Sequence, residues 1–273
     1  MARTTALDPL LGRVLVPGRH GISGVAYTVE ADGGRACGEV AEAGLPEVWI
    51  FGCSWTFGSG EPDETVFPWL LQQRLPQCRI RNYAVPGYGT VQNLLDLRRR
   101  GAKAKPAHVV FVYGEFHWKR NVPNLYFIGK FMTGETRSLT HFQRARLDRH
   151  GRLSIDIVEV KPEAGLPRLG GLDEKLIEPD EFTQVQATIR LIQEAAADAA
   201  RLGARFTLAH VTGAADPVVE AVRASGIAVV DFAAPLAAVP LAERWNAAKH
   251  PSAPVHRGYA GALLPVLQAD APS

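Results

Sequence analysis

The stretch Glu47-Val48-Trp49-Ile50-Phe51-Gly52-Cys53-Ser54 decides how this chain folds. Its first five residues form a compact, mostly apolar run that ends at Gly52, which is typical of a central strand buried on both faces. A strand that runs into a tight glycine turn presents Ser54 at the edge of the sheet, where the serine N–H can face a developing negative charge. The alternative is a turn serine that caps the next helix, and over 51–60 alone both interpretations are equally good.

The rest of the chain alternates between predicted strands and predicted helices. Apolar runs predict further strands over 79–85, 108–113, 205–210 and 227–231. Apolar residues at helical spacing, bounded by proline, glycine or a capping residue, predict helices over 67–75, 90–100, 184–202, 217–224 and 253–267. Because parallel strands need long crossovers that are usually helical, this alternation predicts a three-layer α/β/α fold with a five-stranded, mostly parallel, flavodoxin-like sheet.

Two parts of the chain fall outside this alternation. Residues 1–45 are glycine-rich and predict an irregular extension with one short strand over 25–29, ahead of an α/β domain over 46–270. The segment 121–180 is too long for a structureless connection, so we expect an insertion. Its alternation over 146–160, around His150-Gly151, predicts a β-hairpin in an inserted lid or small β subdomain.

Composition excludes several classes of protein. With 47% hydrophobic and 21% charged residues in 273, the chain is globular, and its net charge of +2 is too small to indicate nucleic-acid binding. We see no signal peptide and no run of 18 apolar residues, so we expect a cytoplasmic protein that does not enter a membrane. Three cysteines without ligand spacing predict neither disulfides nor a metal site. The run Gly58-Ser59-Gly60 lacks the lysine of a phosphate loop, and we expect no cofactor.

Two further segments at predicted strand ends carry unusual residues. Gly87, in the turn 82–90, can offer an unhindered backbone N–H, although glycine turns after strands are ordinary. His250, followed by Pro251 and placed just before the last predicted helix, is a plausible general base. Taken alone, a loop histidine is more often structural. His256 falls inside the predicted last helix, and we interpret it as a helix residue.

Together, the three segments resemble the SGNH/GDSL hydrolase superfamily across roughly 47–267. The serine block matches Gly52-Cys53-Ser54, the glycine block matches 82–89, and the histidine block matches His250-Pro251. Residues 60–75 are also similar to a common bacterial branch of that superfamily. The order and spacing of the three blocks make a strong fold signal.

The resemblance implies a serine esterase or deacylase. Ser54 would attack an acyl carbonyl, His250 would take its proton, and the N–H groups of Ser54 and Gly87 would hold the oxyanion. The expected reaction is hydrolysis of a carboxylic ester, on a small molecule or a glycan, through an acyl-enzyme. Two alternatives stay open: an O-acyltransferase on the same site, and a degenerate relative that binds a ligand without catalysis.

The sequence departs from the superfamily pattern at three positions. Cys53 stands where an aspartate usually precedes the nucleophile, and Phe116 stands where an oxyanion-binding asparagine is expected. Ala247 occupies the position of the acid three residues before the histidine. Candidates for the missing donor are His117 and Asn121. Candidates for orienting the base in place of the acid are a backbone carbonyl, Asn246 and Glu115.

Overall fold

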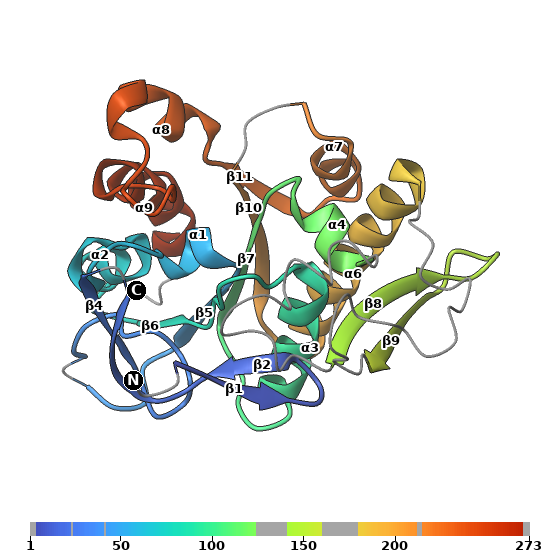
Figure 1. The fold of residues 1–273 in the computed structure, drawn as a ribbon, viewed down its shortest axis with the longest axis horizontal. Helices are drawn as coiled ribbons and strands as arrows, with labels where there is room; N and C mark the ends of the chain where they lie inside the picture. Colours follow the sequence, from blue (N-terminus) through green and yellow to red (C-terminus); the bar gives the residue numbers. More distant parts are fainter. Residues whose placement is uncertain are drawn as a thin grey trace, which may run out of the picture.

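The computed structural model describes residues 4–22, 24–40, 42–123, 141–159, 180–211 and 215–269. Its centre is a five-stranded sheet in the order β11-β10-β7-β5-β6 (Figure 1), and every neighbouring pair in it is parallel. The strands are β5 (Glu47–Phe51), β6 (Arg79–Asn82), β7 (His108–Tyr113), β10 (Arg205–His210) and β11 (Ala228–Asp231). Numbered along the chain, this order is 2-1-3-4-5, so the predicted flavodoxin-like parallel sheet is confirmed.

Helices cover both faces of the sheet, as the three-layer prediction requires (Figure 1). One face carries α3 (Thr90–Gly101), the short α4 (His117–Asn121), α6 (Glu181–Arg201) and α7 (Pro217–Ala224). The other carries the short α1 (Ser54–Phe57), α2 (Phe67–Arg74), α8 (Ala233–Ala238) and α9 (Ala253–Gln268). Two single-turn helices, η1 (Asp63–Thr65) and η4 (Leu241–Glu243), lie in the connections.

Strand β7 shows why the central strands are apolar throughout. Its side chains alternate between the two hydrophobic cores: Val109 and Phe111 face the α3–α6 layer, whereas Val110 and Val112 face the α2–α9 layer. All six residues of β7 are buried. A strand covered on both faces has no solvent side, so its sequence shows a continuous apolar run rather than alternation.

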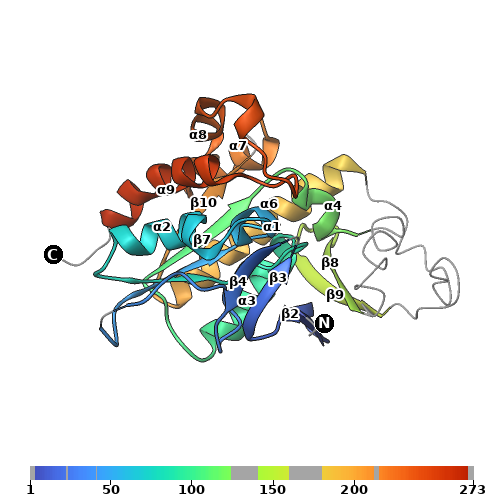
Figure 2. The ribbon, with the colours of Figure 1, turned by 60° about the vertical axis from the view of Figure 1, so that its left-hand side comes forward.

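Two small antiparallel hairpins precede the sheet. β1 (Thr5–Asp8) pairs with β2 (Gly12–Leu15), as Figure 1 shows, and β3 (Gly18–Ile22) pairs with β4 (Val25–Val29), as Figure 2 shows. They share a third hydrophobic cluster with the last residue of α1 and with the segment that follows β6. Its buried members are Leu11, Leu15, Tyr27, Val29, Phe57, Ala84, Val85 and Tyr88. The N-terminal hairpins therefore pack directly against the loops at the carboxyl end of the sheet.

A third hairpin follows α4 along the chain. β8 (His141–Leu147) and β9 (Leu153–Glu159) pair antiparallel in a sheet of their own and contact α3, α4 and α6. The hairpin expected around Gly151 is thus confirmed, and Gly151 has a left-handed φ of 72° at its turn. The rest of the expected insertion, 124–140 and 160–179, lies outside the described residues.

Two sequence expectations need correction. The strand expected over 79–85 ends at Asn82, because the Asn82 side chain accepts the N–H of Ala84 and turns the chain. The extension over 1–45 was expected to hold one strand but contains four, because β1, β2 and β3 are too short and too mixed in polarity to show a clear alternation. No helix in the described ranges is long and apolar enough to cross a membrane.

Candidate active site

Ser54 lies in the first turn after β5, at the carboxyl edge of the sheet. The strand order reverses between β5 and β7, and parallel α/β sheets bind ligands at such a point. Gly52 allows α1 to fold back, since a Cβ there would lie 2.0 Å from the hydroxyl oxygen of Thr56. Ser54 is the first residue of α1, so its N–H has no partner within the helix. This turn therefore offers a hydroxyl group and a hydrogen-bond donor at one residue.

The segment after β6 runs alongside this turn and carries Gly87. Tyr83 and Val85 donate their N–H groups to the carbonyls of Ile50 (2.8 Å) and Gly52 (3.3 Å), which holds the segment against the end of β5. Gly87 has a φ of 87°, a left-handed conformation that glycine adopts without strain. Across the described ranges, no backbone carbonyl accepts its N–H. The Gly87 N–H is therefore outside the sheet ladder, where it can serve a ligand.

His250 lies in a tight hairpin turn just before α9. The N–H of Asn246 donates to the carbonyl of His250 (2.9 Å), and the N–H of Lys249 donates to the carbonyl of Asn246 (2.9 Å). Lys249 has a φ of 58°, as the last residue of a three-residue hairpin loop often does. Trp245 and Pro251 pair antiparallel at the base of the turn. The turn fixes the backbone of the histidine from both sides.

A backbone carbonyl stands where an acidic residue would be expected to orient the histidine. Nδ1 of His250 lies 2.7 Å from the carbonyl oxygen of Ala248. A carbonyl oxygen only accepts, so Nδ1 carries the proton and Nε2 keeps its lone pair. Ala247, at the position of the superfamily acid, is exposed. The tautomer that a base needs is thus set without a carboxylate.

The surroundings of His250 also keep its ring neutral. Partial burial lowers the pKa of His250 below its ordinary value of 6.5, the hydrogen bond to Ala248 opposes that change, and the Arg120 guanidinium lowers the pKa further. At neutral pH the imidazole is therefore in the form that accepts a proton.

Asn246 connects the turn that carries His250 to the loop that follows Ser54 and α1. Its Nδ2 donates to the carbonyl of Ser59 (3.0 Å) and to Oε1 of Glu61 (3.1 Å), while its Oδ1 accepts the N–H of His250 (3.1 Å). Gly60 makes room for this contact, since a Cβ there would lie 2.8 Å from Asn246 Nδ2. The loop that bears the base thus rests directly on the loop that follows the serine.

Three aromatic rings form a cluster around Trp55, the residue after Ser54. The Trp55 ring lies 5.4 Å from the Phe116 ring and 5.3 Å from the Trp245 ring. The Arg120 guanidinium lies over the Phe116 ring at 4.8 Å. Ser54 itself is 9% exposed, and its hydroxyl forms no hydrogen bond within the described part of the chain. Hydrogen bonds of a catalytic serine are often long in the unliganded state and shorten when substrate binds.

An arginine that was not a candidate in the sequence analysis anchors the end of α1 and the loop that follows it. Arg35, 1% exposed, donates to the carbonyls of Phe57 (2.5 Å), Gly58 (2.8 Å) and Glu61 (2.6 Å), and to the Asp63 carboxylate (2.8 Å). A buried charge is tolerated only when it is fully paired, as this one is. A lone arginine in a glycine-rich stretch has no sequence pattern that would reveal such a role.

The two candidates for a third oxyanion donor are fully buried. Asn121 accepts the N–H of Val91 at Oδ1 (3.0 Å) and donates from Nδ2 to the Thr188 hydroxyl (2.8 Å), so its amide is already used within the core. His117 has Nδ1 at 3.3 Å from the Thr90 hydroxyl, and burial holds the pKa of His117 well below its ordinary value. Both side chains fix α4 against its neighbours.

Glu115, the carboxylate proposed from the sequence to orient the base, is exposed. Among the described residues it forms no hydrogen bond or ion pair with His250, whose Nδ1 is taken by Ala248. It lines an open pocket of about 640 Å³ together with Phe116, Trp118, Lys119 and residues at the start of α6. The carboxylate therefore borders this pocket, whose lining includes no residue of the turns that carry Ser54, Gly87 and His250.

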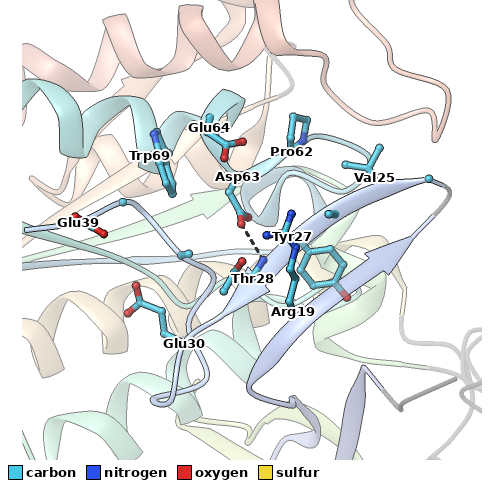
Figure 3. Close-up of a pocket in the computed structure, with 14 residues that line it drawn as sticks. Arg19, Val25, Tyr27, Thr28, Glu30, Glu39, Pro62, Asp63, Glu64 and Trp69 are labelled. Carbon is cyan, nitrogen blue, oxygen red and sulfur yellow. Dashed lines mark hydrogen bonds between the residues drawn. The ribbon is translucent and has the colours of Figure 1, made fainter.

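A second pocket, of about 540 Å³, lies between β4 and the segment that leads into α2 (Figure 3). Trp69, Glu64 and Glu39 line one part of it, and Asp63 accepts the N–H of Thr28 at its floor (2.9 Å). None of its lining residues belongs to the turns of Ser54, Gly87 or His250. Over the described ranges, no cluster of three or more metal-ligating side chains is present.

Comparison with known proteins finds similarity at the level of structure. No protein-family model matches the sequence, and a search of curated proteins gives no match. The crystal structure of TesA is 16% identical, with a TM-score of 0.52, over 82% of this chain and 99% of that one. The structure of a member of the lipolytic protein G-D-S-L family from Veillonella parvula is 13% identical, with a TM-score of 0.47, over 82% of this chain and 99% of that one. The structure of a lipase/acylhydrolase from Enterococcus faecalis is 14% identical, with a TM-score of 0.48, over 82% of this chain and 96% of that one. The chain therefore has the three-layer α/β/α fold that its resemblance to the SGNH and GDSL hydrolases led us to expect.

Proposed function

We propose that this protein hydrolyses carboxylic esters, with Ser54 as nucleophile and His250 as general base. The observation that carries the proposal is the hydrogen bond from His250 Nδ1 to the Ala248 carbonyl. It leaves Nε2 unprotonated on a loop that Asn246 fastens to the serine turn. A histidine with only a structural role would not need an Nδ1-protonated tautomer, a neutral ring and a position on a loop fastened to the one that follows Ser54 all together.

The reaction would proceed through an acyl-enzyme. Nε2 of His250 removes the proton of the Ser54 hydroxyl as Oγ forms a bond to the ester carbonyl carbon. The resulting oxyanion faces the N–H groups of Ser54 and Gly87. When the tetrahedral intermediate collapses, the carbon–oxygen bond to the alcohol breaks and His250 returns its proton to that oxygen. Water then attacks the acyl-enzyme by the same route and releases the acid and Ser54.

The surroundings of the serine favour a small substrate, or one acyl group of a glycan. Trp55, Phe116 and Trp245 supply apolar ring surface near the serine, and Trp245 is 40% exposed. The pocket beyond Phe116 has room for an alcohol or an acyl chain. Aromatic rings of this kind stack on sugar faces as well as on acyl chains, so a glycan ester and a simple ester both remain within the proposal.

A panel of esters tests this function. We expect acid release from 4-nitrophenyl acetate or butyrate, or from an acetylated sugar, at a rate well above that of Ser54→Ala. Adding a large excess of an acceptor alcohol separates hydrolysis from acyl transfer, because transfer yields a new ester in place of free acid. Rates equal to those of Ser54→Ala on every ester would overturn the proposal and favour a binding protein.

Replacing Gly87 should reduce turnover without unfolding the protein. Gly87→Ala tilts or crowds the N–H that faces the oxyanion, so we expect kcat to fall on the order of 10²-fold. The matched control is Gly151→Ala, since Gly151 also has a left-handed φ but lies in open space at a hairpin tip. Both variants place a Cβ in the left-handed region, at a similar backbone penalty of about 1–2 kcal/mol. An equal loss in the two variants would remove Gly87 from the oxyanion site.

The pH dependence of kcat/KM should reflect the lowered pKa of His250. Protonated His250 cannot accept the serine proton, so activity is lost as pH falls through the pKa of the folded protein. Burial and Arg120 lower that pKa, so the acid limb of the profile should have its midpoint below 6.5. Arg120→Gln should move the midpoint upward. A midpoint at or above 6.5 in the unaltered protein would contradict this description of the site.

A further inference from the structure

Two arginines from different parts of the fold bind the backbone carbonyls of Pro86 and Tyr88, the residues before and after Gly87. Arg13, on β2, donates from Nη2 to the carbonyl oxygen of Pro86. Arg120, on α4, donates from Nη1 to the carbonyl oxygen of Tyr88 at 2.9 Å. Gly87 lies between these two carbonyls, and neither arginine contact was apparent from the sequence. The two contacts hold the turn at the carbonyls that flank Gly87.

The Arg13 contact acts on the peptide unit that contains the Gly87 N–H, the proposed oxyanion donor. The carbonyl of Pro86 and the N–H of Gly87 belong to one planar peptide unit, in which a trans geometry points C=O and N–H in opposite directions. A guanidinium bound to the carbonyl therefore directs the Gly87 N–H away from β2. It also withdraws electron density from the peptide, which strengthens that N–H as a donor.

The contact is itself held in place. The Tyr88 hydroxyl donates to the backbone carbonyl of Arg13, and Tyr88 is only 2% exposed. The N–H of Gly89 donates to the Gln92 side chain (2.8 Å), so the peptide after Tyr88 is fixed at its other end as well. The Arg120 guanidinium is stacked on Phe116, which limits its motion. The turn is thus tied to the N-terminal hairpin, to α3 and to α4.

We propose that Arg13 and Arg120 are positioning residues that set the Gly87 N–H for oxyanion binding. The inference rests on the proposed esterase function. It gives the N-terminal hairpin a catalytic consequence, because β2 supplies one of the two guanidinium groups. With Phe116 at the place of a third donor, the site depends on two N–H groups, and the orientation of each one matters more.

The experiment compares Arg13→Gln, Arg13→Lys and Arg120→Gln with the control Arg99→Gln. Arg99 ties the same hairpin to α3 through Asp8 (2.8 Å), and among the described residues it forms no hydrogen bond with Pro86, Gly87 or Tyr88. Active sites are titrated with a fluorophosphonate, so that kcat refers to folded enzyme only. The {1H}-15N NOE of the Gly87 amide is measured in parallel as a readout that needs no activity.

We expect Arg13→Gln and Arg120→Gln to lower kcat about tenfold relative to Arg99→Gln, with KM changed less than about twofold, because orientation of the donor matters in the transition state. Arg13→Lys should recover part of the loss, and it decides the question if Arg13→Gln does not fold. The Gly87 NOE should fall in the two glutamine variants alone.

The inference would be overturned if the wild type is active and Arg13→Gln has the same kcat and the same Gly87 NOE as Arg99→Gln. That result would leave the esterase function intact. If the wild type hydrolyses no ester, the proposed function fails, and an unchanged NOE would then refute the positioning role as well.

Discussion

Ser54→Ala should lower kcat on an activated ester by about 10⁴-fold or more, which is the loss seen when a nucleophile of this kind is removed. The other nucleophilic groups of the turn, the Cys53 thiol and the Thr56 hydroxyl, are 2% and 0% exposed, so we expect neither to replace the Ser54 hydroxyl. The measurement is initial rates of 4-nitrophenyl butyrate hydrolysis at several enzyme concentrations, so that a trace contaminant is detected by its failure to scale.

Ser59→Ala is the matched control. Ser59 lies in the same loop, and its backbone carbonyl, not its side chain, receives Asn246. We expect the control to keep a rate within about twofold of wild type, since substitutions away from a specific contact rarely cost more than a few tenths of a kcal/mol. A loss in Ser59→Ala as large as that in Ser54→Ala would indicate that the loop as a whole, rather than one hydroxyl, is responsible.

His250→Ala should cause a loss as large as that of Ser54→Ala, because the serine hydroxyl is unreactive without a base. The double variant should be no slower than either single variant, since groups that act in one proton transfer are strongly non-additive. The measurement is kcat for both single variants and the double variant on the same ester.

Glu115→Gln serves as the test of an alternative triad. The Ala248 carbonyl already fixes the ring of His250, so we expect Glu115→Gln to stay within about twofold of wild type, against the roughly 10⁴-fold loss that follows loss of an orienting aspartate in serine triads. A Glu115→Gln variant as slow as Ser54→Ala would show that the carboxylate orients the base during turnover. The proposal that Ser54 and His250 act without an acidic residue would then be wrong.

Much of the fold could be predicted because its central elements are marked clearly in the sequence. The strands over 108–113 and 205–210 and the helix over 217–224 have the same bounds in the structure as predicted. Each is a short, mostly apolar segment or helical repeat whose sequence pattern matches its observed secondary structure, so local sequence and tertiary structure agree. The order of the three blocks led us to expect Ser54, Gly87 and His250 at one edge of the sheet.

The contacts that complete the site could not be predicted in the same way. The group that orients His250 is the backbone carbonyl of Ala248, and a main-chain oxygen has no signature in sequence. Arg35 and Arg13 act on carbonyls that are near only after the N-terminal hairpins have packed against the loops. These interactions join residues far apart along the chain, and each depends on tertiary packing rather than on local pattern.

Mass spectrometry after treatment with a fluorophosphonate tests the central claim most directly. The reagent phosphonylates a serine only where a base activates it and donors hold the oxyanion, so it reports the whole arrangement without knowledge of the substrate. We predict one adduct per chain, on Ser54, and no adduct in Ser54→Ala or His250→Ala at the same exposure. An unmodified wild type, or an adduct on another residue that persists in Ser54→Ala, would contradict the assignment of Ser54 and His250 as nucleophile and base.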